Sequence, residues 1–249
     1  MSMTTRQQKF GSLQCHVVDC LEGRAPKLVV VFCHGFGAPG SDLVGLAEPF
    51  LNAADEIAGN VQFVFPEAPI DLAPMGMPGG RAWWPINMEQ LATMYQTRDF
   101  SQLCEREPDG LQAASKLLTE TVQAILDATE LLPSQLILGG FSQGAMAGTD
   151  VVLRTGLQPA ALVLMSGTML CREEWTQLAA KHPGVPVIQT HGTMDMVLPV
   201  EPSEWLRDML KENGFDVQYA SFVGPHTVPP EALQMTAQKI MQLLNESDA

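Results

Sequence analysis

Short apolar segments rich in β-branched residues recur along this 249-residue chain, and stretches with helical periodicity separate them. The predicted strands cover residues 13–20, 27–33, 61–65, 135–140, 161–167, 185–192 and 216–222. Most are apolar throughout, which is typical of strands covered on both faces, whereas the first and last alternate as edge strands do. The order predicts an α/β fold with a mostly parallel central sheet and helices on both faces.

The helical stretches and the chain length favour one domain spanning residues 1–249. Helical spacing of apolar residues is clear in 109–129, and helix-terminating or helix-initiating residues mark 201–214 and 228–244. A chain of this length can bury one large core. Residues 66–109 are rich in Pro, Gly, Met and Trp and too long for a simple connection, which predicts a cap-like insertion that helps to build a pocket. Within it, Leu91, Met94 and Tyr95 have helical spacing, either as a small cap helix or as a helix packed on the body.

The charge and the cysteines exclude several classes of function. The formal net charge is −14, which argues against nucleic acid and anionic membrane surfaces as partners. Five scattered cysteines form neither a disulfide framework nor a metal-binding spacing, and they fit a reducing, cytoplasmic location. No apolar leader or membrane-spanning segment is recognisable, so we expect no stable membrane insertion.

The pentapeptide Gly140-Phe141-Ser142-Gln143-Gly144 lies between a predicted strand and a predicted helix. This is the context of a nucleophile elbow, where a tight turn exposes a serine and side chains two positions away would collide. A tight turn with a helix-capping serine is the alternative interpretation. A serine hydroxyl is a weak nucleophile near neutral pH and needs a base.

Downstream residues supply a base and an acid in the order that such an elbow requires. His226 follows the last predicted strand, and Asp195 follows another strand at the same sheet edge. His182 has no acid in a suitable context, and His191 precedes Asp195 and breaks the order. A surface-loop histidine and an Asx turn are the alternatives for His226 and Asp195. Together with the elbow, the order predicts a triad of Ser142, Asp195 and His226.

A tetrahedral intermediate also needs hydrogen-bond donors for its oxyanion. The expected donors are the backbone N–H groups of Gln143, which follows the nucleophile, and of Phe36 in the loop after an early strand. Glycines at 35 and 37 allow a close approach of this loop. We interpret His34 as a structural histidine that holds the loop.

These motifs, taken together, resemble the phospholipase/carboxylesterase family of α/β-hydrolases, which includes acyl-protein thioesterases and small bacterial carboxylesterases. The matching stretches are "VVVFCHGFG", "FVFPEAP", "GGRAWW", "DGLQAA", "LILGGFSQGAMA", "LVLMSG", "QTHGTMDMVLP" and "GPHTVPPE". The resemblance implies an α/β-hydrolase fold and cofactor-free hydrolysis of carboxylic esters or thioesters by this triad. Ala38, where relatives often have an acidic residue, and Pro85, where they often have Asp, depart from the family pattern.

The predicted function is therefore a serine esterase or thioesterase that acts on small to medium apolar acyl groups, with lysophospholipase or acyl-protein thioesterase as alternatives. A non-catalytic binding protein of the same fold is less favoured, because every triad and elbow residue is retained. We expect the substrate to be a small acyl ester or thioester and no cofactor or metal to be needed; the oligomeric state stays open. The predicted pocket residues are Trp83, Trp84, Met75 and Met77.

Overall fold

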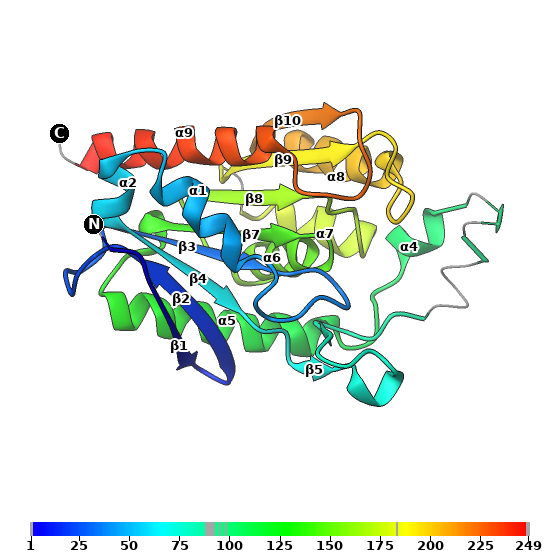
Figure 1. Cartoon of the computed structure of the whole chain (residues 1–249). Helices are drawn as coiled ribbons and strands as arrows, with labels where there is room; N and C mark the ends of the chain where they lie inside the picture. Colours follow the sequence, from blue (N-terminus) through cyan, green and yellow to red (C-terminus); the bar gives the residue numbers. More distant parts are fainter. Residues whose placement is uncertain (1, 88–92, 95, 98, 183, 248–249) are drawn as a thin grey trace.

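A central sheet of eight strands organises the molecule (Figure 1). The computed structural model describes residues 2–87, 93–94, 96–97, 99–182 and 184–247. The strand order is β1-β2-β4-β3-β7-β8-β9-β10. The strands are β1 (Thr4–Phe10), β2 (Leu13–Asp19), β3 (Leu28–Cys33), β4 (Val61–Pro66), β7 (Leu136–Phe141), β8 (Ala161–Met165), β9 (Pro186–Gly192) and β10 (Asp216–Phe222).

The sheet is parallel from β4 to β10 and antiparallel only at its β1–β2–β4 side. Strand β10 forms one edge, as predicted for residues 216–222. The prediction that residues 13–20 form the other edge is wrong, because β1 pairs with β2 and covers it. Six of the seven residues of β1 are exposed, so this strand has no apolar pattern that sequence periodicity could detect.

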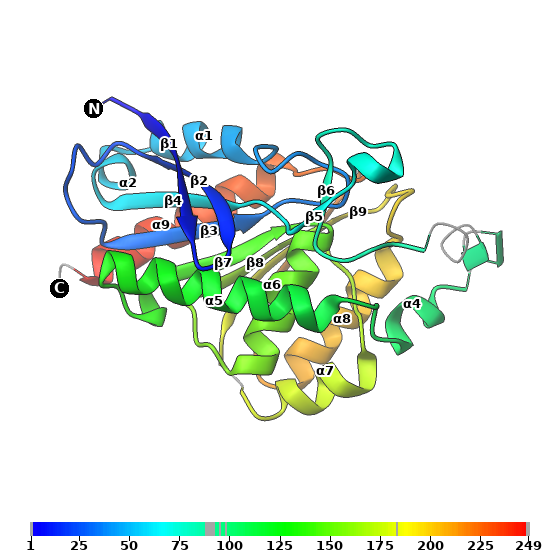
Figure 2. The same cartoon turned by 90° about the horizontal axis from the view of Figure 1, so that it is seen from below.

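Helices cover both faces of the sheet, as Figure 2 shows. One face carries α5 (Leu111–Thr129), α6 (Gln143–Thr155), α7 (Arg172–Ala179) and α8 (Val200–Glu212). The other carries α1 (Ala47–Leu51), α2 (Asp55–Asn60) and α9 (Pro230–Ser247). Each helical layer buries its own apolar cluster against the sheet, so the strands between them are apolar on both faces. The mostly parallel sheet and its two helical layers confirm the predicted fold class.

The described residues between β4 and α5 lie outside the main sheet. They include a small antiparallel sheet of β5 (Ile70–Asp71) and β6 (Arg81–Ala82) and the short helix α4 (Ser101–Glu105). Figure 1 shows α4 projecting beyond the ends of the parallel strands. Leu91 and Tyr95 lie outside the described residues, whereas Met94 is helical and buried.

Within the described residues, no helix combines the length and the apolar character that crossing a lipid bilayer requires.

Candidate active site

Four loops meet at the carboxyl edge of the parallel strands. They follow β3, β7, β9 and β10 and contain Phe36, Ser142, Asp195 and His226. Parallel strands point their carboxyl ends in the same direction, so loops that are far apart in sequence converge at one edge of the sheet. The structure therefore brings the predicted triad residues and oxyanion loop to the same end of the molecule.

The serine lies at a strained turn between β7 and α6. Its φ of 55° and ψ of −121° fall outside the regions that L-residues ordinarily occupy. A Cβ atom on Gly140 would lie 2.2 Å from the Cys33 carbonyl oxygen, and one on Gly144 would lie 2.1 Å from the same atom. The two glycines are thus required because the turn packs directly on the backbone that leaves β3. This is the geometry of a nucleophile elbow.

Asp195 holds His226 by a short hydrogen bond. The His226 Nδ1–H donates to Asp195 Oδ2 at 2.6 Å, while the other carboxylate oxygen accepts backbone N–H groups from Val197 and Leu198, both at 2.8 Å. Burial alone would raise the pKa of Asp195, but the hydrogen bonds from His226, Leu198 and Val197 outweigh it and lower that pKa below its ordinary value. The carboxylate therefore stays ionised and fixes the imidazole with Nε2 free to face a reacting group.

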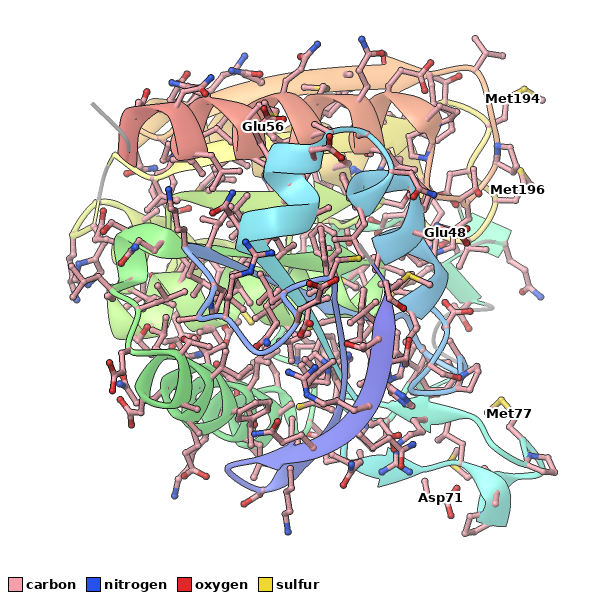
Figure 3. All side chains as sticks on the ribbon, turned by 60° about the vertical axis from the view of Figure 1, so that its left-hand side comes forward. Glu48, Glu56, Asp71, Met77, Met194 and Met196 are labelled. Carbon is pink, nitrogen blue, oxygen red and sulfur yellow. The ribbon has the colours of Figure 1, made fainter. Side chains whose placement is uncertain are left out.

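The loops that carry Asp195 and His226 are joined to each other. Thr193 donates its N–H to the Phe222 carbonyl at 2.8 Å, and Met194 donates to the Gly224 carbonyl at 3.0 Å. A Cβ on Gly192 would lie 2.4 Å from the Gly224 carbonyl oxygen, so only glycine permits this contact. The Met194 and Met196 side chains project outward from the same region in Figure 3.

The loop after β3 is held by His34, in agreement with its predicted structural role. Its Nε2 accepts the Ala68 N–H at 3.1 Å, so the proton lies on Nδ1, which donates to the Gly35 carbonyl at 2.8 Å. Burial lowers the pKa of His34, which keeps the imidazole neutral. Phe36 then follows at the rim of the cavity beside Ser142.

Gln143 joins the elbow to the segment after β6. Its backbone N–H belongs to the first residue of α6, where no carbonyl of the same helix can accept it. Its buried side chain accepts the Trp83 N–H and donates to the Trp84 carbonyl, both at 2.9 Å. Sequence reasoning gave Gln143 only a backbone role, because a contact 60 residues away in sequence leaves no local signal.

A cavity of about 870 Å³ opens beside Ser142 and His226. Trp84 lines it, but Trp83, Met75 and Met77 are not among the described residues that do so, which corrects their predicted place in the pocket. Trp83 is buried elsewhere because its indole N–H donates to the His34 carbonyl at 2.9 Å. Met75 is 55% exposed, and Met77 lies near Gly37 on the connection between β5 and β6.

Other apolar residues also line the cavity, and most of them were not predicted to do so. They are Phe36, Ile86, Met94, Leu103, Phe141, Met146, Leu170, Val197 and Leu198. Met146 had a usable signal, because a residue one helical turn after Ser142 lies on the same side of α6. Leu170 and Leu103 had none, since only tertiary packing brings them to the site. Ala38 and Pro85, which depart from the family pattern, also line the cavity.

Among the described residues, one group has the side chains of a metal site: Glu107, Cys171 and Glu174. Arg154 already bonds both carboxylates, with Nη1 at 2.6 Å from Glu174 and Nη2 at 2.9 Å from Glu107. Its Nε also donates to Asp150 at 2.8 Å. The group is therefore explained as an ion-pair network that ties the cavity rim at Glu107 to α6 and α7.

The chain is similar in sequence and in fold to known proteins. Residues 13–244 match the phospholipase/carboxylesterase family. Acyl-protein thioesterase 1 of Candida albicans is 26% identical over 220 residues, which cover 85% of this chain and 90% of that protein. Acyl-protein thioesterase 1 of Kluyveromyces lactis is 30% identical over 182 residues, covering 70% of this chain and 72% of that protein. The crystal structure of esterase PE8 superimposes with a TM-score of 0.71 at 27% identity, over 91% of this chain and 97% of that one.

Proposed function

The chain belongs to the phospholipase/carboxylesterase family of α/β-hydrolases, and from this premise we propose that Ser142, His226 and Asp195 are its catalytic triad. As a member of that family it is a serine hydrolase of carboxylic esters or thioesters. The observation that carries the triad assignment is the 2.6 Å bond between His226 and Asp195, made beside a serine in an elbow on the same cavity.

In the first half of the reaction, Ser142 Oγ attacks the substrate carbonyl carbon while His226 Nε2 takes the hydroxyl proton. Asp195 keeps the imidazole tautomer and stabilises the imidazolium that forms. Collapse of the tetrahedral intermediate breaks the bond to the alcohol or thiol, and His226 returns the proton to that leaving group. Water then attacks the acyl-enzyme by the same route, which releases the carboxylic acid and restores Ser142.

The oxyanion of each intermediate would accept the backbone N–H groups of Phe36 and Gln143. Two features support these donors: both residues line the cavity beside Ser142, and Gln143 begins a helix whose N-terminus carries partial positive charge. Removing one such donor typically costs about 3 kcal/mol of transition-state stabilisation. The Gln143 side chain would fix this donor by its bonds to Trp83 and Trp84.

The acyl group would occupy the apolar part of the cavity. Trp84, Met146 and Leu170 offer flexible and aromatic surface beside Ser142. A volume of about 870 Å³ has room for small to medium acyl groups and part of a leaving group. We propose that residues 66–109 form a cap-like insertion of a single domain, because residues 84–87, 102–103 and 106–109 contribute to the lining. Acyl-protein thioesterase activity is the second candidate, since relatives over most of the chain have that name.

A cytoplasmic location is proposed on the basis of the thiols. All five cysteines are buried and free. Unpaired thiols in these numbers suit a reducing compartment.

Active-site labelling tests the proposed function. A fluorophosphonate probe should label the wild-type protein at Ser142, and Ser142→Ala should abolish the labelling while the protein remains folded. Absence of labelling in the wild type would favour a non-catalytic binding protein with this fold.

We expect kcat/KM to fall on acidification with a slope of one on logarithmic axes. Burial lowers the pKa values of His34 and His191, which favours their neutral forms, and hydrogen bonds lower the pKa of Asp195, which favours its carboxylate. The proposed mechanism uses one general base, the His226 imidazole, and one bound proton disables it. A pH–rate profile measured with a neutral ester checks this. A slope of two, or a flat profile between about pH 5 and 8, would contradict it.

We expect neutral thioesters to be better substrates than polyanionic thioesters with the same acyl group. The net charge of −14 repels anions at long range. Among the described lining residues, Asp42, Glu107 and Asp109 are acidic and Arg106 is basic. Added salt should reduce the difference because it screens exposed charges. The measurement is kcat/KM for both substrates at low and high ionic strength. A preference for the polyanion at low salt would contradict the electrostatic argument.

A further inference from the structure

Two consecutive residues at the end of β8 contact the segments that carry all three proposed triad residues. The Met165 carbonyl accepts the backbone N–H of Ser142 at 2.8 Å. The Ser166 N–H donates to the Thr190 carbonyl at 2.9 Å, on the strand that leads to Asp195. The Ser166 hydroxyl donates to the Thr227 carbonyl at 3.3 Å, one residue after His226.

Ser166 makes these contacts from an unfavourable backbone conformation. Its φ is 52°, in the region that glycine adopts without strain, and its side chain is completely buried. Glycine would be less strained than serine at position 166. The chain has serine there and glycine at the next position, 167. Strained residues of this kind cluster at active sites, where the surrounding structure holds them in place. Among the described residues, the Ser166 side chain bonds the Thr227 carbonyl.

The loop that bears His226 is exposed to solvent, so contacts with the protein body must hold its backbone in place. Val223 is 85% exposed, and the residues on both sides of His226 are exposed as well. The Gly224 carbonyl is held on one side by the Met194 N–H, and the Thr227 carbonyl is held on the other by Ser166. His226 therefore lies between two fixed carbonyls, one attached to the Asp195 loop and one to the end of β8.

We propose that Ser166 is a positioning residue for the hydrolytic reaction. Its hydroxyl fixes the backbone after His226, so that the imidazole keeps its bond to Asp195 and presents Nε2 to Ser142. This role rests on the triad proposed above. Without the hydroxyl, the Thr227 carbonyl loses its buried donor, the loop shifts, and the reacting groups spend less time in a productive arrangement.

Two substitutions separate the hydroxyl from the backbone strain. Ser166→Ala removes the hydroxyl and keeps a Cβ in the strained conformation, whereas Ser166→Gly removes both. We expect each variant to lower kcat by about 10- to 100-fold, with KM within about twofold of the wild type. Inactivation by a fluorophosphonate should slow by the same factor. Ser166→Gly should be at least as stable as Ser166→Ala, which keeps the test valid if the alanine variant folds poorly.

Ser203→Ala is the matched control. Ser203 is also completely buried, and its hydroxyl oxygen accepts the Gln189 side-chain N–H at 2.9 Å on helix α8. We expect this variant to lose thermal stability as Ser166→Ala does but to retain the wild-type kcat. An equal loss of kcat in Ser203→Ala would show that any buried serine bond matters and would overturn the specific role of Ser166.

A spectroscopic measurement follows the bond between His226 and Asp195 directly. A low-field proton resonance of His226 Nδ1–H should be present in the wild type, broadened in both Ser166 variants and unchanged in Ser203→Ala. Wild-type kcat and an unchanged resonance in both Ser166 variants would overturn the inference. If the wild type itself is not labelled at Ser142 by the fluorophosphonate, the triad proposal fails, which is a different result.

Discussion

Ser142→Ala and His226→Ala should each lower kcat by about 10⁴- to 10⁶-fold, and the double variant should be little slower than either single variant. The hydroxyl and the imidazole act in one proton transfer, so each group contributes to catalysis only when the other is present. Residual hydrolysis would come from substrate binding and the oxyanion donors, which neither substitution removes. Steady-state and single-turnover rates with an activated aryl ester provide the measurement.

Thermal unfolding is the control for these variants. Alanine carries a Cβ and occupies the φ of 55° at Ser142 with about the same strain as serine, so Ser142→Ala should unfold near the wild-type temperature. Losses that multiply in the double variant would show that the two residues act independently. That result would contradict the assignment of one coupled triad.

Gly144→Ala should lower both stability and activity, because its Cβ has no space. The added atom would lie 2.1 Å from the Cys33 carbonyl oxygen and 2.6 Å from that of His34, and both are backbone atoms that cannot rotate away. Adding an atom where packed backbone must move typically costs about 1–3 kcal/mol and occasionally more. It would also move Ser142 and the Gln143 N–H, so we expect kcat to fall at least about 100-fold. Circular-dichroism melting and ester hydrolysis measure the two effects.

Gly148→Ala provides the matched control on the same helix. It lies one turn further along α6, and its Cβ would meet no atom closer than 3.6 Å, which is ordinary contact. Replacing a glycine in a helix interior with alanine typically stabilises by roughly 0.5–1 kcal/mol. We therefore expect equal or higher stability and unchanged activity. A similar loss in both variants would indicate that α6 tolerates no added atom and that the collision at Gly144 is not the cause.

The success of the sequence predictions depended on how local their signals were. Ser142 was recognisable from neighbouring residues alone, because glycines lie on both sides of it and an apolar strand pattern precedes it. The partnership of Asp195 and His226 followed from chain order, because loops after parallel strands share one edge. Strand β1 was missed because an exposed edge strand needs no apolar pattern, only a neighbour with free backbone groups.

Composition alone did not identify which apolar side chains line the cavity. Trp83 and Trp84 are adjacent in sequence and equally apolar, yet Trp84 lines the cavity while Trp83 donates its indole N–H to the backbone of His34. Met75 and Met77 lie on the connection between β5 and β6 and are not among the described residues that line the cavity. The direction of each side chain depends on the register of this segment against Gln143, and that register is a long-range contact.

The sequence by itself determined the fold class, the elbow and the order of the three triad candidates, because periodicity, glycine positions and chain order are properties of local segments and of their succession. Only the tertiary structure decided which residues line the cavity, why both elbow glycines must lack a side chain, and that Ser166 contacts the residue after His226. Each of these depends on atoms brought together from distant strands, such as Cys33 against Gly144 and Ser166 against Thr227. Such contacts arise when the sheet aligns its carboxyl ends, and no single segment encodes them.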